Sequence, residues 1–374
     1  MKITDRNRIH FVGSIAGNNA DEVFRNCCGA VGDYLARIPD GETGYRSKYI
    51  SHLAHTVYAR HPDVVTVSRP PPVDPDNPQE WRKPGEDWIP MATDASDLWK
   101  FGLRKGVRTL RFETLGYAEA AIESYKAFCA VREQGIIPEG VRFQVSLPAA
   151  VDGMGFFVDR FADMRYFIPA YENAMAADIR RMLEVIPPGD LAIQWDNVAS
   201  VLEHEARVAG HKLPVKIPFL ARLLMGSPDK RFRQILKTFA ANVPPEVEFG
   251  IHFCYGDIGH KHIFEPRDLS VCVHLANEAV NHAGRKVNWV HIPAPRDRKD
   301  DAYYWPLQHL SDATHLYLGL VHLTDGVKGT KTRIEVARKY KTPFGISTEC
   351  GFGRRPPETI PALLELHKEA ASLI

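Results

Sequence analysis

The sequence predicts an α/β protein folded as a (β/α)8 barrel, with residues 1–374 forming a single domain. Eight short apolar segments of strand length recur along the chain, and segments compatible with helices separate them. Polar residues collect where these strands end, and barrel active sites occupy the carboxyl-terminal rim of the strands. An open doubly wound sheet is the alternative, but no glycine-rich nucleotide fingerprint follows any predicted strand.

The individual elements follow from local patterns. The strands are expected near residues 10–14, 34–38, 141–146, 191–196, 246–252, 287–291, 316–322 and 343–348. Asn19, with Glu22 three residues later, predicts a capped helix start after the first strand. A later helix is predicted from apolar residues at helical spacing, namely Tyr171, Met175, Ile179, Met182 and Ile186.

Composition limits the classes of function. The chain has 374 residues, is 44% hydrophobic and 25% charged, and carries a formal net charge of +1, which suits a soluble globular protein. Near-neutral charge gives no electrostatic reason to expect nucleic acid or a membrane surface as a partner. The N-terminus lacks a signal-peptide core, and the six cysteines are dispersed, so we expect reduced thiols and a cytoplasmic location. A homo-oligomer is compatible with this composition.

Residues 69–90 interrupt the alternation of strands and helices. They contain seven prolines together with Trp81 and Trp88, so they cannot form a helix or a central strand. We expect a long surface excursion, and loops of such length are often lids.

The segment 248–257 concentrates side chains that bind metals. It is an apolar run of strand length that ends in a Tyr-Gly-Asp turn, and it carries His252 and Cys254. Side chains two residues apart on a strand share a face, so this imidazole and thiol project together. They are ligands that Zn²⁺ prefers, although a buried cysteine more often packs as a small hydrophobic residue.

A barrel would bring further ligands to the same mouth. His291 and Cys350 also fall at predicted strand ends, which gives the candidate zinc ligands His252, Cys254, His291 and Cys350. The alternatives are a buried turn cysteine for Cys350 and a hydrogen-bonded core histidine for His291. The convergence of all four favours a metal site, in which zinc would hold an incoming thiol as a nucleophilic thiolate.

Five short motifs, in this order along the chain, carry a family resemblance. They are Val12-Gly13-Ser14, Gly41-Glu42-x-x-x-Arg46, Ile193-Gln194-Trp195-Asp196, His252-Phe253-Cys254-Tyr255 and Thr348-Glu349-Cys350-Gly351. From about residue 10 to 370, the chain resembles the catalytic domain of cobalamin-independent methionine synthase. The resemblance implies a barrel in which a zinc-bound thiolate attacks an alkyl donor.

The resemblance also implies roles for individual residues. It makes His252, Cys254 and Cys350 zinc ligands, while the family's sixth-strand glutamate ligand falls at about His291, so a three-residue or a His₂Cys₂ set is expected. The candidate substrate-binding residues are Ser14, Asp40, Glu42, Arg46 and Asp196. The resemblance gives this role to Ser14, Glu42 and Asp196, and the carboxylates of Asp40, Glu42 and Asp196 suit an ammonium group. The family's catalytic histidine falls near Thr324, which makes His322 and Asp325 the candidates for proton transfer.

The implied partners are small molecules, namely a thiol and an alkyl donor. A folate-type methyl donor is one expectation, although the sequence has no counterpart of the N-terminal barrel half that helps the synthase to bind folate. Single-barrel relatives that join an epoxide to the thiol coenzyme M are similar in size and in their His-x-Cys…Cys pattern.

Two other functions stay open. A metal-free enzyme similar to uroporphyrinogen decarboxylase would use arginines against substrate carboxylates, and Arg37, Arg46 and Arg296 are the candidates. A non-catalytic barrel that binds a small molecule or buffers zinc is the other alternative.

Overall fold

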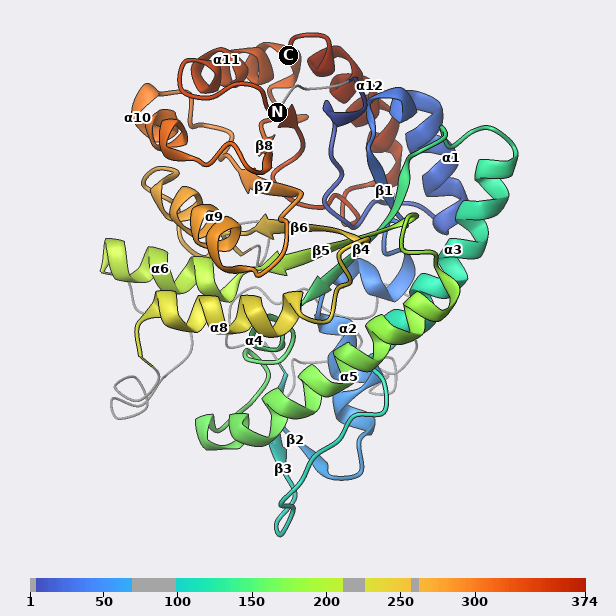
Figure 1. Ribbon diagram of the computed structural model, residues 1–374, viewed down its shortest axis with the longest axis vertical. Helices are drawn as coiled ribbons and strands as arrows, with labels where there is room; N and C mark the ends of the chain where they lie inside the picture. Colours follow the sequence, from blue (N-terminus) through green and yellow to red (C-terminus); the bar gives the residue numbers. More distant parts are fainter. Residues whose placement is uncertain (1–4, 69–98, 211–225, 257–261) are drawn as a thin grey trace, which may run out of the picture.

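A curled sheet of seven parallel strands lies at the centre of the molecule (Figure 1). The computed structural model describes residues 5–68, 99–210, 226–256 and 262–374. In spatial order the strands are β1 (Arg37–Pro39), β4 (Arg142–Pro148), β5 (Leu191–Asn197), β6 (Glu248–Phe253), β7 (Trp289–Pro293), β8 (His315–Gly319) and β9 (Gly345–Ile346). Because neighbouring strands are parallel, their carboxyl ends all lie at one edge of the sheet.

The first predicted strand, residues 10–14, is not a strand of this sheet. It makes only isolated bridges among the described residues, the first of them from Ile9 to both Leu35 and Ile346, so this segment lies next to both edge strands. Side chains from the sheet occupy its carbonyl groups. Gln144 donates to the Phe11 and Val12 carbonyls at 3.0 and 2.9 Å, in place of the regular ladder of a paired strand.

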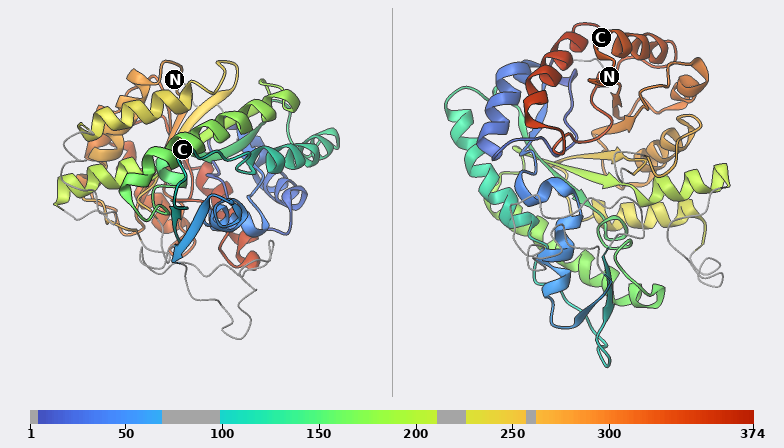
Figure 2. Two further views of the ribbon diagram at one scale, coloured as in Figure 1. Left: turned by 90° about the horizontal axis from the view of Figure 1, so that it is seen from below. Right: turned by 180° about the vertical axis from the view of Figure 1, so that it is seen from behind.

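Helices cover the outer face of the sheet (Figures 1 and 2). The helices within the described residues are α1 (Ala20–Val31), α2 (Ser51–Thr56), α3 (Tyr117–Glu133), α4 (Ala150–Gly153), α5 (Met164–Val185), α6 (Ala199–Ala209), α8 (Pro228–Ala240), α9 (Ser270–His282), α10 (Asp301–Tyr304), α11 (Gly326–Arg338) and α12 (Ile360–Ala371). Of these, the short α2 and α4 lie beside the end of the molecule that carries the strands β2 (Val64–Ser68) and β3 (Lys100–Leu103) (Figure 1). The helix α1 packs against both α3 and α12, so the helical layer continues from the last helix to the first. None of the helices within the described ranges combines the length and apolar character that crossing a membrane requires.

Two predictions about helices are confirmed. The Asn19 side chain caps α1 by accepting a hydrogen bond from the Glu22 backbone N–H at 2.9 Å. The predicted apolar stripe is buried along α5 and at the residue that follows it.

An antiparallel hairpin, β2 (Val64–Ser68) and β3 (Lys100–Leu103), was not predicted from the sequence. It lies apart from the central sheet (Figure 1) and brackets the proline-rich stretch 69–90, which lies outside the described residues.

The inner face of the sheet is unusually polar near the amino ends of the strands. Arg37 is buried there, 3.9 Å from the ring centroid of Trp289, and it donates to Glu248 at 3.0 Å and to Tyr317 at 3.2 Å. Arg37 is therefore engaged at the opposite end of the strands from the rim where substrates would enter, which removes it from the decarboxylase alternative.

Candidate metal centre and active site

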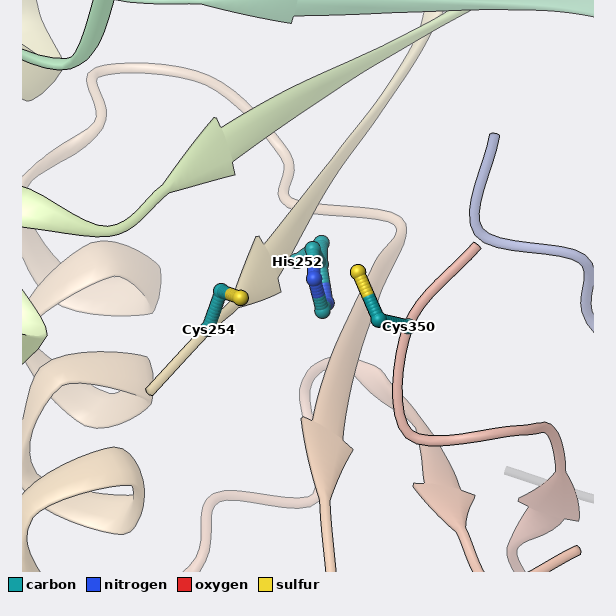
Figure 3. A group of neighbouring side chains, drawn as sticks. All are labelled: His252, Cys254 and Cys350. Carbon is teal, nitrogen blue, oxygen red and sulfur yellow. The ribbon is translucent and has the colours of Figure 1, made fainter. Parts of the chain in front are cut away.

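Three candidate ligands converge at the carboxyl end of β6. One ligand atom each from His252, Cys254 and Cys350 lies within 4.8 Å of the other two. His252 is the penultimate residue of β6 and Cys254 follows the strand, while Cys350 comes from the loop after β9 (Figure 3). In Figure 3 the two sulfur atoms lie on either side of the imidazole.

Hydrogen bonding determines which nitrogen of His252 faces the sulfurs. His291 Nε2 lies 3.0 Å from the Thr348 carbonyl oxygen, which can only accept, so Nε2 of His291 carries the proton. Burial lowers the pKa of His291 well below its usual value, so its Nδ1 accepts a hydrogen bond from His252 Nδ1 at 2.7 Å. In the neutral His252 ring, Nε2 is then unprotonated. It is buried, and within the described part of the chain it makes no regular hydrogen bond, although the His252 ring interacts with the Cys350 sulfur. A buried nitrogen lone pair directed at sulfur suits a metal ligand.

His291 therefore differs from its expected role. Both of its ring nitrogens are used, one by His252 and one by Thr348, and it is not part of the three-residue cluster. We assign it the orientation of His252 in place of direct ligation.

Replacing His291 with Phe tests this assignment. The variant keeps a ring of similar size but removes the acceptor for His252, so we expect zinc affinity to fall about 10–100-fold without complete loss. Competition with a chromophoric chelator measures the affinity. His55→Phe, which alters a buried histidine packed on Trp99, should leave zinc affinity unchanged. Equal affinity in His291→Phe and wild type would contradict the assignment.

The environment of Cys350 favours the thiolate that metals bind. A hydrogen bond with Cys254 lowers the pKa of Cys350 well below its usual value, and His252 acts in the same direction while burial opposes both. One imidazole nitrogen and two sulfurs form a donor set that suits zinc.

An acidic pocket adjoins the cysteines. Asp40 accepts hydrogen bonds from Arg46 and Ser124, both at 2.6 Å. Burial alone would raise the pKa of Asp40, but the Arg46 charge and these bonds lower it, so Asp40 is ionised and paired. The Arg46 guanidinium is thus already paired with a carboxylate of the protein. Asp40, Glu42 and Arg46 line a small cavity of about 20 Å³, which is the size of a single water site.

In Glu42 and Asp196, neighbouring groups do not offset the effect of burial on the carboxyl pKa as they do in Asp40. Burial raises the pKa of Glu42 to about 8, and the Asp40 and Cys350 charges add to this while Arg46 opposes it. Burial and the Glu42 charge raise the pKa of Asp196 well above its usual value, despite a hydrogen bond from Gln194 at 2.8 Å. Two buried carboxyl groups that resist ionisation are suited to a ligand that supplies positive charge.

The raised pKa of Glu42 predicts how stability depends on pH. Glu42 keeps its proton up to pH about 8 in the folded state, whereas the ordinary pKa of a glutamate in the unfolded chain is 4.5. The stabilisation that Glu42 contributes is therefore complete below pH 4.5 and declines as pH rises from 4.5 to about 8. In metal-stripped protein, the unfolding free energy of wild type should therefore fall relative to that of Glu42→Gln as the pH rises through this range. Urea unfolding at pH 5, 7 and 9 measures it, with the exposed Glu365→Gln on α12 as control. A difference independent of pH would contradict the burial of Glu42.

Ser14 lies beside the loop that carries Cys350. Its carbonyl accepts a hydrogen bond from the Phe352 backbone N–H at 2.6 Å, and the two segments also form the Ile15–Phe352 bridge. The structure thus brings Ser14, Asp40, Glu42, Arg46 and Asp196 to the strand ends around the three ligands.

A larger cavity of about 830 Å³ is lined in part by Cys254 and Cys350. His322 lines it, with Nε2 3.0 Å from the Ala294 carbonyl and Nδ1 3.5 Å from Glu349 Oε2. Glu349 also lies 3.4 Å from His262. Burial would lower the pKa of His262, but Glu349 and Glu265 raise it to about 9. Glu349 and His262 were missed from the sequence, although Glu349 stands inside the motif that supplies Cys350.

Asp325 does not share this environment. Arg333, which is fully buried, donates to both of its carboxylate oxygens at 2.7 and 2.8 Å, and Lys299 lies 2.9 Å away. The hydrogen bonds from Arg333 and Lys299 lower the pKa of Asp325, so it is a poor proton acceptor. This pairing at the start of α11 disfavours the proton-transfer role that the sequence suggested for Asp325.

Comparison with solved structures shows that the fold is shared. A B12-independent methionine synthase from Shewanella sp. W3-18-1, in complex with selenomethionine, superposes with a TM-score of 0.54 at 11% sequence identity, covering 94% of this chain and 86% of that chain. The curled parallel sheet thus belongs to an architecture that this synthase also has.

Two other solved structures overlap less well. A putative vitamin-B12-independent methionine synthase from Listeria monocytogenes gives a TM-score of 0.44 at 13% identity, covering 70% of this chain and 71% of that chain. A methyltransferase from Methanosarcina mazei gives 0.38 at 11% identity, covering 87% and 99%. No family model and no curated protein matches the sequence.

Proposed function

We propose that this protein is a zinc-dependent alkyltransferase that activates a small-molecule thiol, with methylation as its principal reaction. The observation that carries the proposal is the cluster of His252, Cys254 and Cys350, with Nε2 of His252 oriented toward the sulfurs by His291. The fold shared with a methionine synthase supports it. We also infer that the seven strands and the bridging segment 9–15 close into a single-domain (β/α)8 barrel.

His252, Cys254 and Cys350 would hold the zinc. When bound, zinc would supply Lewis-acid stabilisation that keeps a thiol substrate ionised near neutral pH. Glu42 and Asp196 are close enough to Cys350 for its charge to raise the pKa of both carboxyl groups. They would bind an ammonium group on the thiol substrate and thereby orient it. His322, which is buried beside Glu349, would receive the proton that the thiol releases.

The larger cavity would receive the alkyl donor. Its volume of about 830 Å³ is within the usual range for small-molecule sites. Arg354 and Arg355 line it, together with Arg296 and Arg298, which pair with Asp297 and Asp300. Arg354 and Arg355 favour a donor with anionic groups, and a folate-type methyl donor is one such compound. The decarboxylase alternative gains no support, because Arg46 pairs with Asp40 and Arg296 with Asp297.

A donor screen tests the proposal. Zinc-loaded protein is incubated with amino-acid thiols and coenzyme M, each with methyl or epoxide donors, and alkylated products are measured by mass spectrometry. We expect turnover with at least one pair and none in Cys254→Ser. A Cys254→Ser variant with full zinc content and full turnover would overturn the proposal.

A further inference from the structure

A second group of metal-binding side chains lies in the helical layer. His204 comes from α6, Asp229 from α8 and His274 from α9, and one ligand atom of each lies within 4.8 Å of the others. Nε2 of His204 and Nε2 of His274 lie 2.9 and 2.8 Å from the same oxygen, Oδ1 of Asp229. None of the three lines the larger cavity described above.

The backbone orients His204 as it would a metal ligand. His204 Nδ1 lies 2.7 Å from the Ser200 carbonyl oxygen, which can only accept, so Nδ1 carries a proton. In the neutral ring, the Nε2 lone pair then points at the Asp229 carboxylate. A nitrogen lone pair and a carboxylate oxygen then face each other at 2.9 Å, and a cation that both can bind makes this arrangement favourable.

Exposure and neighbouring charges also suit an ion. The His204 side chain is 9% exposed and fixed, whereas Asp229 and His274 are 35% and 48% exposed, so an ion can enter and keep water. The two arginines nearest to Asp229 along α8 pair elsewhere, Arg231 with Glu203 and Arg233 with Glu278.

We propose that His204, Asp229 and His274 bind a divalent first-row cation, zinc foremost, which joins α6, α8 and α9. Two imidazoles and one carboxylate are ligands that zinc accepts, and solvent would complete the coordination. This site holds no sulfur, so it differs chemically from the cysteine centre and does not depend on the function proposed for that centre. Its effect is structural, because an ion that binds only the folded arrangement stabilises it.

Equilibrium dialysis of metal-stripped full-length protein against zinc tests the proposal, with elemental analysis and thermal unfolding as readouts. We expect His274→Ala and Asp229→Asn each to bind about one zinc fewer per chain than wild type. Added zinc should raise the Tm of Cys350→Ser but not of Cys350→Ser/His274→Ala. His282→Ala, which removes a partly exposed histidine from the same helix, should bind as much zinc as wild type.

The outcomes separate the two centres. Zinc lost only in Cys350→Ser, with His274→Ala equal to wild type and no zinc-dependent Tm shift in Cys350→Ser, would overturn the outer site and leave a hydrogen-bonded cluster. Zinc lost only in His274→Ala and Asp229→Asn would support the outer site even if the cysteine centre fails. Circular dichroism verifies that each variant is folded. If His274→Ala does not fold, the zinc content of Asp229→Asn decides between the outcomes.

Discussion

Cys350→Ser should lose zinc from the cysteine centre and, with it, all alkyl transfer. Cys350 supplies one of only two sulfurs in the cluster, and its neighbours favour its thiolate form. A serine hydroxyl remains protonated near neutral pH and is a poor zinc ligand. We expect zinc affinity to fall more than about 100-fold, beyond the effect of losing an orienting partner such as His291. Chelator competition and product formation measure the two losses.

Cys129→Ser provides the matched control. Cys129 lies on α3 and is partly exposed like Cys350, but it is not part of the cluster, so this variant should retain zinc and turnover. Zinc binding of wild-type strength in Cys350→Ser would place the metal elsewhere and contradict the proposed function.

Gly250→Ala should lower the unfolding free energy more than any of the other single-residue substitutions described above. Gly250 pairs with Trp289 between β6 and β7, and an added Cβ would lie 1.9 Å from Trp289 Cε2. The indole is fully buried and covered by Arg37, so it has no free space to move into. We expect a loss of about 3 kcal/mol in unfolding free energy, at the upper end for overpacking. Urea denaturation measures it.

Gly29→Ala makes the same chemical change where there is room. Gly29 is exposed on α1, and an added Cβ meets no atom within 4 Å, so the variant should gain about 0.5–1 kcal/mol from helix propensity. Trp289→Leu, combined with Gly250→Ala, should recover part of the loss by vacating the space. Equal stability of Gly250→Ala and wild type would show that the sheet interior is less tightly packed than it appears in these contacts.

Local patterns predicted most of the strands because buried parallel strands are continuous apolar runs. The segments around β4, β5, β6 and β7 were found in this way, within a few residues of their ends. The first segment has the same composition but makes only isolated bridges among the described residues, and Gln144 and Gln194 bind the carbonyl groups of Phe11 and Val12 from within the sheet. Such long-range competition leaves no signal in the segment itself.

In the candidate site, too, some features follow from local sequence patterns and others from long-range contacts. The spacing of His252 and Cys254 predicted that they would lie together, since it depends only on strand geometry. The role of His291 depends on the position of the Thr348 carbonyl, and that of Asp325 on Arg333, which reaches back from within α11. The residue types identified these positions as polar strand ends. Only the three-dimensional arrangement shows whether the nitrogen or oxygen atoms of these side chains are already hydrogen-bonded within the protein or can bind a metal or a proton.

The hydrogen-bond chain from Thr348 through His291 to His252 has a thermodynamic consequence. Thr348 stands two residues before Cys350 on the same loop, so the backbone that positions one ligand also sets the proton position on another. The contributions of His252 and Cys350 to metal affinity should therefore be non-additive, with a coupling free energy that a double-mutant cycle can measure. Displacement of this loop would therefore disturb the positions of both residues together.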